Sequence, residues 1–357
     1  MHEHYNLKRR QFIKISGMAL GTGLLEACTP TNKNLSVSQA SEKSNSIKLG
    51  LSWKAEAEYG GFYQAVATGI YRDYGLEVEI QPIPPQGNTT QLLMGGLVDF
   101  TIGQGISTLQ AVAQGIPKIT LAAIFQDEIQ VLLTHPGVGN DSLDKLKGKP
   151  VFITAGLSST YWPLLAKKYG YTADQQRPYN FNVTPFLVNK NSAQEGILTS
   201  EPYLIEKEGG FKPIILPLKE TGLNPYAFTI DTTKQLVADN PNLVERFVDA
   251  SIEGWYSYLE NPEPGNELIK QDNPEMTDEL MSFALNKIAE YDPIRSGDAK
   301  TLGIGAMSDD RWKTLAEQLI EVGVLDANFN YKDAYTLEFV NKGVDYYTES
   351  IKFIVKC

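Results

Sequence analysis

The sequence predicts an α/β protein with two lobes. Strand-like and helix-like segments alternate from residue 47 to about residue 230, and the chain is mainly helix-like from there to residue 322. The roughly 310 residues that follow the first 46 exceed one ordinary hydrophobic core, which favours two domains. No repeat of fixed period is apparent in the chain.

The first sheet is predicted from short apolar or alternating runs that are separated by helix-like stretches. The expected strands are residues 47–53, 77–80, 100–103 and 119–124, and the expected helices are residues 60–71, 89–94 and 107–113. Strands that alternate with helices in this way are typical of a largely parallel sheet.

A second group of elements begins after His135. Its expected strands are residues 151–154, 183–188 and 214–216, with a helix over residues 159–169. After Pro225 the sequence predicts one more strand, residues 227–230, and then helices over residues 241–259, 277–291 and 308–322. Pro241 suits a first helical position, and Ser308 and Gly323 suit the start and end of the last helix.

The simplest arrangement is a first lobe that the chain leaves and later re-enters. We expect crossings near residues 134–138 and 224–228, and these two segments form a hinge. Lobe 1 then comprises residues 47–135 and 226–357, and lobe 2 comprises residues 136–225. The tail from residue 341 has an apolar side and is expected to dock on lobe 1 as one helix.

The N-terminal residues 1–27 read as an export signal. Lys8-Arg9-Arg10-Gln11-Phe12-Ile13-Lys14 matches a twin-arginine signal, and the apolar stretch over residues 15–25 is too short to span a bilayer. Leu25-Glu26-Ala27-Cys28 resembles the lipobox of bacterial lipoproteins, although Glu26 replaces the usual small residue. We expect a lipid on Cys28, with an incidental thiol as the alternative, and a polar tether over residues 28–46.

Composition excludes several classes of function. The formal net charge is −11, which argues against a nucleic-acid partner because such proteins need clustered cations. The chain has two cysteines and three histidines, of which only His135 lies beyond the export signal, so no metal site and no cofactor are expected. A glycine-rich loop with Lys-Ser or Lys-Thr is absent, so nucleotide hydrolysis belongs to another subunit.

Ordered short motifs cover residues 47 to 260. They are Leu51-Ser52-Trp53, Tyr59 to Ala65, Gly69-Ile70-Tyr71, Tyr74 to Val78, Gly95 to Phe100, Gly115-Ile116-Pro117, residues 143–151, Ser200-Glu201-Pro202-Tyr203 and Glu208-Gly209-Gly210. In this order they resemble the solute-binding proteins of ABC transporters of the thiamine-pyrimidine, sulfonate and nitrate type. The run that begins at Ser200 is typical of the thiamine-precursor branch.

The resemblance implies a periplasmic-binding-protein-like fold of type II, with a ligand cleft between its lobes. Such a protein closes on one small molecule and delivers it to a membrane permease. The expected partners are therefore the small-molecule ligand, the permease with its ATPase subunit, and the membrane through the lipid anchor. No second copy of the chain is expected.

Candidate ligand residues in the first lobe follow its strands, because ligand sites favour strand ends that face a cleft. By the resemblance, the aromatic side chains of Trp53 and Tyr59 stack on the ligand, whereas packing in the core is the alternative. Gln104 and Ser107 follow the strand at residues 100–103 and can meet a polar ligand edge. Ser107 could instead cap a helix.

Candidates in the second lobe are polar. Gly156, Ser158, Ser159 and Thr160 are expected in a loop that opens a helix and offers N–H groups and hydroxyls to an anionic or carbonyl group, with helix capping as the alternative.

Glu201 precedes Pro202, which favours extended geometry, and its carboxylate can accept two N–H donors of an aminopyrimidine. The alternative is a carboxylate that lies on the surface or supports the hinge. Tyr226 could close the ring sandwich or pack the hinge.

The aromatic and carboxylate candidates favour a flat, donor-rich heterocycle such as a thiamine-precursor pyrimidine. A sulfonate or nitrate receptor should present cations, and only a distant one such as Arg177 is available. A pyrimidine synthase shares the fold, but it needs an active-site histidine, a cofactor lysine and a cysteine cluster, so we expect no enzyme. A third interpretation, which stays open, is a ligand sensor that takes no part in transport.

Overall fold

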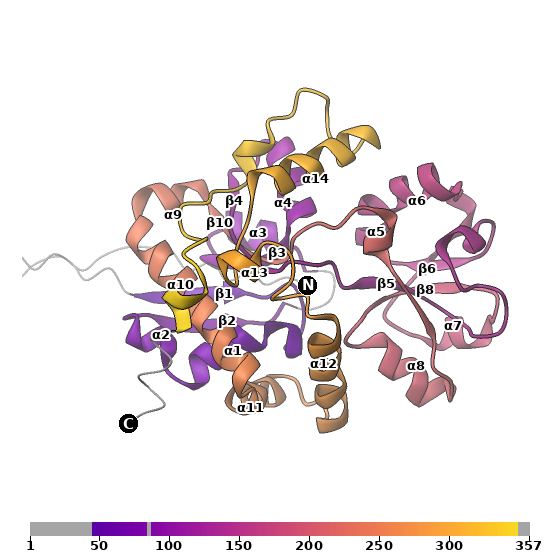
Figure 1. Ribbon diagram of the computed structural model, residues 1–357, viewed down its shortest axis with the longest axis horizontal. Coiled ribbons are helices and arrows are strands. Elements are labelled where there is room, and N and C mark those ends of the chain that lie inside the picture. Colours follow the sequence, from indigo (N-terminus) through magenta and orange to yellow (C-terminus); the bar gives the residue numbers. More distant parts are fainter. Residues whose placement is uncertain (1–44, 84–86, 349–357) are drawn as a thin grey trace, which may run out of the picture. The chain divides into compact units, whose positions relative to one another are not determined.

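The computed structural model describes residues 45–83 and 87–348. The expected export signal, Cys28, most of the tether and Cys357 lie outside the described residues. Within the described residues the chain forms two five-stranded sheets with helices around them (Figure 1). The α/β class and the two-sheet arrangement predicted from the sequence are therefore confirmed.

The first sheet has the strand order β2-β1-β3-β10-β4. Its strands are β1 (Ser46–Gly50), β2 (Glu77–Gln81), β3 (Phe100–Gln104), β4 (Lys118–Phe125) and β10 (Ala227–Thr233). Strand β1 is parallel to β2 and β3, and β10 runs antiparallel to both β3 and β4. Strand β1 ends at Gly50 rather than at Trp53, because its pairing with β2 ends at Gly50 and Gln81 and its pairing with β3 ends at Gly50 and Thr101.

The second sheet has the order β7-β6-β8-β5-β9. Its strands are β5 (Gln130–Thr134), β6 (Val151–Ile153), β7 (Gln176–Pro178), β8 (Ala193–Ile197) and β9 (Ile214–Pro217). The predicted strand over residues 183–188 is wrong, because Thr184–Val188 forms helix α7. Pro185 suits the first turn of that helix, and Asn182 Oδ1 accepts a hydrogen bond from the Thr184 N–H (2.9 Å).

The chain passes between the sheets earlier than expected. Strand β4 of the first sheet ends at Phe125 and strand β5 of the second begins at Gln130, so the first crossing is residues 126–129 and not residues 134–138. The return runs from the end of β9 to the start of β10 and includes the expected residues 224–226. The apolar run over residues 130–134 predicts a strand, but it does not indicate which of the two sheets this strand joins.

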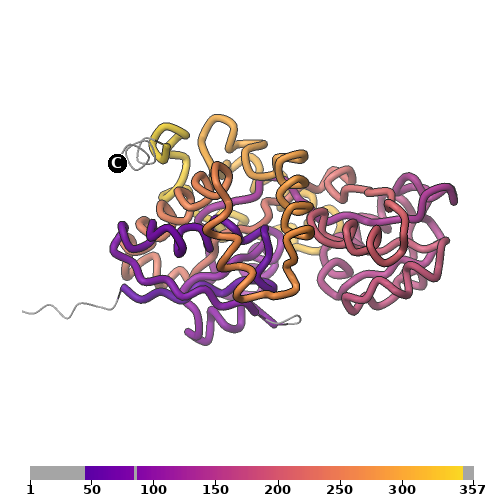
Figure 2. The backbone as a smooth tube through the Cα atoms, turned by 90° about the horizontal axis from the view of Figure 1, so that it is seen from below, coloured from indigo at the N-terminus to yellow at the C-terminus, as the bar shows by residue number. Residues whose placement is uncertain are grey.

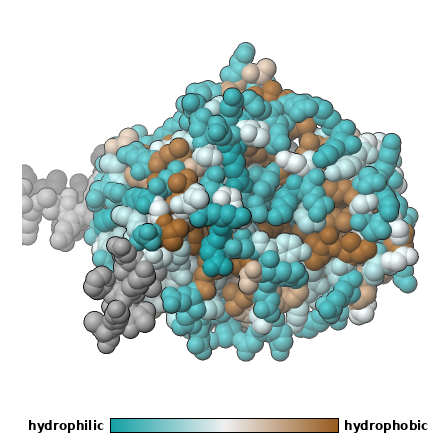
Figure 3. Space-filling model, viewed as in Figure 1, coloured by the Kyte–Doolittle hydropathy of each residue, from teal (hydrophilic) through white to brown (hydrophobic). Residues whose placement is uncertain are grey.

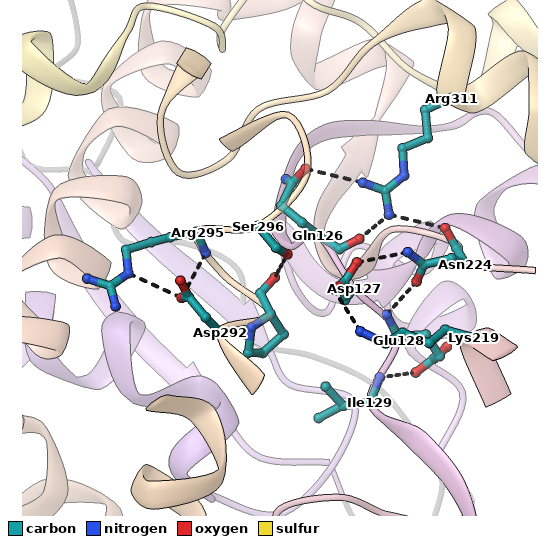
Figure 4. Close-up of polar contacts among 11 residues, drawn as sticks. Gln126, Asp127, Glu128, Ile129, Lys219, Asn224, Asp292, Arg295, Ser296 and Arg311 are labelled. Carbon is teal, nitrogen blue, oxygen red and sulfur yellow. Dashed lines mark hydrogen bonds and ion pairs between the residues drawn. The ribbon is translucent and has the colours of Figure 1, made fainter. Parts of the chain in front are cut away.

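A network of polar contacts joins the two crossings (Figure 4). Arg311, from helix α14 (Asp309–Glu321), donates to the backbone carbonyls of Gln126 and Asn224, the latter at 3.1 Å. Asp127 accepts from Lys219 Nζ (3.0 Å) and from Asn224 Nδ2 (2.8 Å), and these donors hold the pKa of Asp127 below its usual value. The crossings are thus tied to each other and to α14.

Helices α1 (Gly60–Ala67) and α2 (Ile70–Asp73) pack against β2, and α10 (Pro241–Glu260) packs against α1 and β4. Helix α11 (Glu263–Asp272) packs on α1, and α12 (Asp278–Tyr291) contacts the short 3-10 helix at residues 57–59. The expected helix over residues 60–71 is interrupted at Gly69, whose φ of +85° suits glycine. The three predicted helices after Pro241 agree with α10, α12 and α14 to within a residue or so.

The remaining helices are α3 (Thr89–Met94), α4 (Gly105–Ala113), α5 (Ala155–Thr160), α6 (Trp162–Tyr169), α8 (Glu201–Gly209), α9 (Lys234–Asp239) and α13 (Ala299–Leu302). Helix α12 lies between the two sheets in Figures 1 and 2. Its Phe283 ring is 5.6 Å from the Tyr203 ring of α8, so α12 contacts the second-sheet side.

The described part of the tail docks on α10, as expected. Residues 344–348 are helical, and Tyr347 is buried with its hydroxyl 3.2 Å from Asp249 Oδ1. Lys342 Nζ lies 2.7 Å from Asp249 Oδ2.

The face in Figure 3 is mostly hydrophilic with separate hydrophobic groups. Over the described residues, we find no helix with the length and apolar character that crossing a membrane requires.

Candidate functional site

The two sheets meet where the loop after β1 faces the start of α8. The ring of Trp53 lies 4.5 Å from the ring of Phe181, with an interplanar angle of 52°. Glu58, in the short 3-10 helix Ala57–Tyr59, accepts a hydrogen bond from the Thr199 hydroxyl on the opposite side. These contacts close the space between the sheets and bury polar groups in it; we call the residues around it the cleft.

Aromatic side chains line both sides of the cleft. Phe181 contacts Tyr179 as well as Trp53, at 5.4 Å between ring centroids. The Tyr59 ring lies 5.4 Å from that of Phe228. Phe181 and Phe228 have φ angles of +59° and +48°, a conformation that L residues adopt at a cost of about 1–3 kcal/mol. Residues with such backbone strain are often found at functional sites, so both phenylalanines are candidates for ligand contact.

Three carboxylates meet at this cleft. Glu56 Oε1 accepts from Trp53 Nε1 (3.2 Å), and Glu201 accepts from the Ile197 N–H (2.7 Å) and the Tyr179 hydroxyl (3.1 Å). Burial raises the pKa of all three groups, Glu56, Glu58 and Glu201. The negative charges of Glu58 and Glu201 raise the pKa of Glu56 further. We name Glu56, Glu58 and Glu201 the carboxylate triad.

Two more buried carboxylates lie behind the triad on the second-sheet side. Glu195 accepts from the Thr154 N–H (2.6 Å) and hydroxyl (3.0 Å). Glu128 accepts from the Tyr161 hydroxyl (3.0 Å) and from two backbone N–H groups. Neither carboxylate, nor any of the triad, forms an ion pair within the part of the chain that the structure describes. No group of His, Cys, Asp and Glu in that part suits a metal ion.

The burial of Glu195 can be tested through the pH dependence of the protein's stability. Burial raises its pKa from 4.5 to about 7, so the native state holds a proton that the unfolded chain releases above pH 4.5. The contribution of this group to stability is therefore present below pH 4.5 and is lost as the pH rises through 7. The loss is of the order of 3 kcal/mol at 1.36 kcal/mol per pKa unit.

Urea unfolding of wild type and Glu195→Gln at pH 5 and pH 8 measures this contribution. We expect the wild type to lose more stability between the two pH values than the variant, because glutamine carries no titrating charge. Glu338→Gln, at an exposed site, is the matched control and should behave like wild type. Equal pH dependence in all three proteins would contradict a raised pKa at Glu195.

The structure places the predicted first-sheet residues as follows. Trp53 and Tyr59 both lie at the cleft, where Tyr59 is buried and its hydroxyl is 2.8 Å from Ser52 Oγ. Gln104 ends β3 and is half-buried. Ser107 lies inside α4, which begins at Gly105, so the alternative role of Ser107 as a helix cap is wrong. Ligand contact by these four residues stays a prediction.

The expected loop over residues 156–160 is wrong, because these residues lie within helix α5 and Thr154 is its N-cap. Ser159 and Thr160 hydroxyls donate to the Gly156 carbonyl, both at 2.9 Å. The Ser158 hydroxyl donates to Gln176 Oε1 at 2.7 Å. Backbone acceptors within one turn of a helix account for two of the hydroxyls, which the sequence pattern left unexplained.

Glu201 is the first residue of α8 rather than an extended residue, because proline is tolerated in the first helical turn. Tyr226 is fully buried, and its hydroxyl accepts from the Ser308 N–H (2.9 Å) and donates to Asp298. The Arg311 guanidinium lies 4.1 Å from the Tyr226 ring centroid. Tyr226 thus packs at the second crossing, and a ligand contact for it and for Glu201 stays a prediction.

Sequence reasoning missed Glu56, Glu58, Phe181, Glu195 and Thr199. A signal existed for three of them, because Glu56 and Glu58 stand between Trp53 and Tyr59, and Thr199 precedes the run at Ser200. Phe181 and Glu195 had no local signal, since neither lies in a motif. A cavity beside Glu128 and Lys219 holds about 10 Å³, the space of roughly one water molecule, so a heterocycle does not fit there.

His135 does not reach the cleft carboxylates through any contact seen in the structure. Its Nε2 lies 2.9 Å from the Phe186 carbonyl oxygen. Its ring packs against the rings of Phe186 and Phe211, at 4.5 Å and 4.4 Å between centroids. His135 therefore contributes to the core of the second-sheet side.

Comparisons with known proteins agree with this architecture. A family model described as NMT1/THI5 like matches residues 56–264. The riboflavin-binding protein RibY of Chloroflexus aurantiacus is 25% identical over 307 residues, which covers 83% of this chain and 86% of RibY. A 4-amino-5-hydroxymethyl-2-methylpyrimidine phosphate synthase of Schizosaccharomyces pombe is 24% identical over 147 residues, 41% of this chain and 42% of the synthase.

A solved structure has the same fold. The periplasmic aliphatic sulphonate binding protein SsuA from Escherichia coli superposes with a TM-score of 0.60 at 15% identity, covering 81% of this chain and 91% of SsuA. The periplasmic-binding-protein fold that the motif resemblance implied is therefore confirmed.

Proposed function

The chain belongs to the NMT1/THI5-like family, and from this premise we propose that it is the solute-binding lipoprotein of an ABC importer. It captures a small nitrogen heterocycle, such as a thiamine-precursor pyrimidine, in the cleft and delivers it to a permease that an ATPase subunit drives. Cys28 carries the lipid that anchors the exported chain, which works as a monomer. The chain does not catalyse a reaction.

One observation carries this proposal: aromatic rings and carboxylates from both sides lie together at the closed cleft. Trp53 and Phe181 offer flat apolar surfaces on which a ring can stack. Glu201 and Glu58 offer oxygen acceptors beside those rings, which suit the N–H donors of an amino-substituted heterocycle. Closure of the two sides around such a ligand is a hinge movement at the two crossings.

The carboxylates argue against an anionic ligand. A sulfonate or nitrate would lie beside Glu56, Glu58 and Glu201, and no ion pair of the described residues brings a cation to these groups to neutralise an anion. Arg177, the distant cation considered from the sequence, donates instead to backbone carbonyls of Asp174 and Gln176. The likeness to a sulphonate-binding protein, at 15% identity, concerns the fold.

A synthase reaction is the alternative from another class, because some relatives are pyrimidine phosphate synthases. A reaction that needs a free histidine finds only His135 in the described chain, and its ring is packed between two phenylalanines. The RibY alignment spans most of both chains, whereas the synthase alignment spans less than half of each. These facts favour a binding protein.

A thermal-shift screen of the mature chain tests the proposal. The panel holds aminopyrimidines, thiamine, riboflavin, an alkanesulfonate and nitrate. A ligand that binds only the native state stabilises it by about 2.7 kcal/mol at a hundredfold excess over its Kd. We expect a raised midpoint with at least one nitrogen heterocycle and none with the anions. A raised midpoint with the anions alone would contradict the assignment of a heterocyclic ligand, but it would not contradict the assignment of a solute-binding fold.

A further inference from the structure

Resting on that function, we propose that the carboxylate triad is a subsite for positive charge, and that the heterocycle binds as a cation. The positive group is an amino-substituted ring protonated at a ring nitrogen, or a quaternary ring nitrogen. It enters between the triad and the rings of Trp53 and Phe181. The ligand thus supplies a counter-charge that the described residues do not provide.

The three carboxylates of the triad come from both sides of the cleft. Glu56 and Glu58 belong to the loop and short helix after β1, and Glu201 begins α8 next to the second sheet. Their charges act on one another strongly enough that Glu58 and Glu201 each raise the pKa of Glu56. Closure of the cleft therefore brings like charges together, which is unfavourable unless a cation or protons accompany it.

Cations among the described residues do not neutralise the triad. Lys54 is the one cation whose charge acts on Glu56, and its Nζ lies 2.5 Å from Glu275 in an exposed ion pair. The other groups that face the triad are acceptors or neutral donors. They are Glu195 beside Glu201, Tyr179 and the Ile197 N–H on Glu201, Thr199 and Tyr258 beside Glu58, and Trp53 on Glu56.

One oxygen of the triad has no hydrogen-bond partner among the residues that the structure describes. Glu58 is 3% exposed; its Oε1 accepts from Thr199, whereas its Oε2 is shut off from solvent and makes no hydrogen bond. Leaving a buried charged acceptor unsatisfied is costly, so native structures retain such a group where a donor arrives from elsewhere. An N–H of a bound cationic ring is a donor of the required kind.

The neighbouring rings suit the same ligand. The faces of Trp53 and Phe181 lie at the cleft next to Glu56, and aromatic faces attract cations through their quadrupole. Phe181 has a φ of +59°, a strained conformation that the surrounding contacts maintain. A flat cation can therefore stack on an aromatic ring with its N–H edge turned towards the carboxylates.

A matched pair of small probes tests the proposal on the whole mature protein. 4-Aminopyridine is protonated at neutral pH, and 4-pyridone is an uncharged ring of the same size. Calorimetry gives the affinity of each probe for wild type, Glu56→Gln, Glu58→Gln and the exposed control Glu338→Gln. Repeating the titration in buffers of different ionisation enthalpy counts the protons that binding releases.

We expect wild type to bind 4-aminopyridine at least tenfold more tightly than 4-pyridone and to release protons on binding at pH 7. Glu58→Gln should lose most of this preference, and Glu338→Gln should keep it. If the two probes bind wild type equally, or if the preference survives in Glu56→Gln and Glu58→Gln, the cationic subsite is wrong although heterocycle capture stands. If no heterocycle of either charge binds any of the four proteins, both proposals fail.

Discussion

Replacing Gly254 by valine is expected to lower the free energy of unfolding by more than about 3 kcal/mol. Gly254 lies on α10 where this helix crosses α1, and a Cβ placed on it would stand 2.4 Å from the backbone carbonyl oxygen of Gly61 and 2.7 Å from Ala65 Cβ. A backbone atom cannot move aside as a flexible side chain can, so the two helices must separate. Overpacking typically costs about 1–3 kcal/mol, and more where the backbone has to shift.

Urea unfolding followed by circular dichroism measures this effect. Glu260→Val is the matched control, because it introduces the same side chain at an exposed position of the same helix. The control should stay within about 0.5 kcal/mol of wild type, as exposed substitutions commonly do. An unfolding midpoint for Gly254→Val equal to that of the control would show that the helices do not approach as closely as the structure indicates.

Trp53→Ala is expected to weaken binding of the heterocycle by about thirtyfold. The indole is half-buried against Phe181 and donates to Glu56, so its removal takes away a stacking surface and frees a triad carboxylate. Truncating a well-packed aromatic contact costs about 2 kcal/mol, which corresponds to that factor in Kd. Calorimetry with a ligand found in the thermal-shift screen measures the change.

Trp53→Phe is the control for this prediction. It retains a flat ring but lacks the indole N–H, so we expect an affinity between those of wild type and Trp53→Ala. The unfolding midpoint of each ligand-free variant shows whether the fold is preserved. Unchanged affinity in Trp53→Ala, with an intact fold, would move the ligand away from the Trp53 side of the cleft.

Much of the fold was predictable because its signals are local. The strands β1, β2, β3, β4 and β10 and the helices α10, α12 and α14 have clear periodicity or caps, and the structure confirms them. The error at residues 183–188 arose because a short apolar run suits a buried strand and a helix equally well. Pro185 was the local sign that favoured the helix.

The first crossing could not be read from local sequence. Residues 130–134 form a strand in either arrangement, and their place in the second sheet follows from pairing with β8 and β9, far along the chain. The same is true of Tyr226, whose partners Ser308, Asp298 and Arg311 come from segments more than 70 residues away. Contacts between residues that are so far apart in the chain produce no periodic pattern in the sequence.

The sequence by itself determined the α/β class, the two sheets, most helices and the segment at Trp53 and Tyr59 that faces the cleft. Only the tertiary structure decided which carboxylates meet, because Glu56 and Glu201 lie far apart in the chain and come together through the approach of the two sheets. Local patterns record the conformation of the backbone. The charge, burial and strain of a site between two sheets depend on long-range contacts, which no local pattern contains.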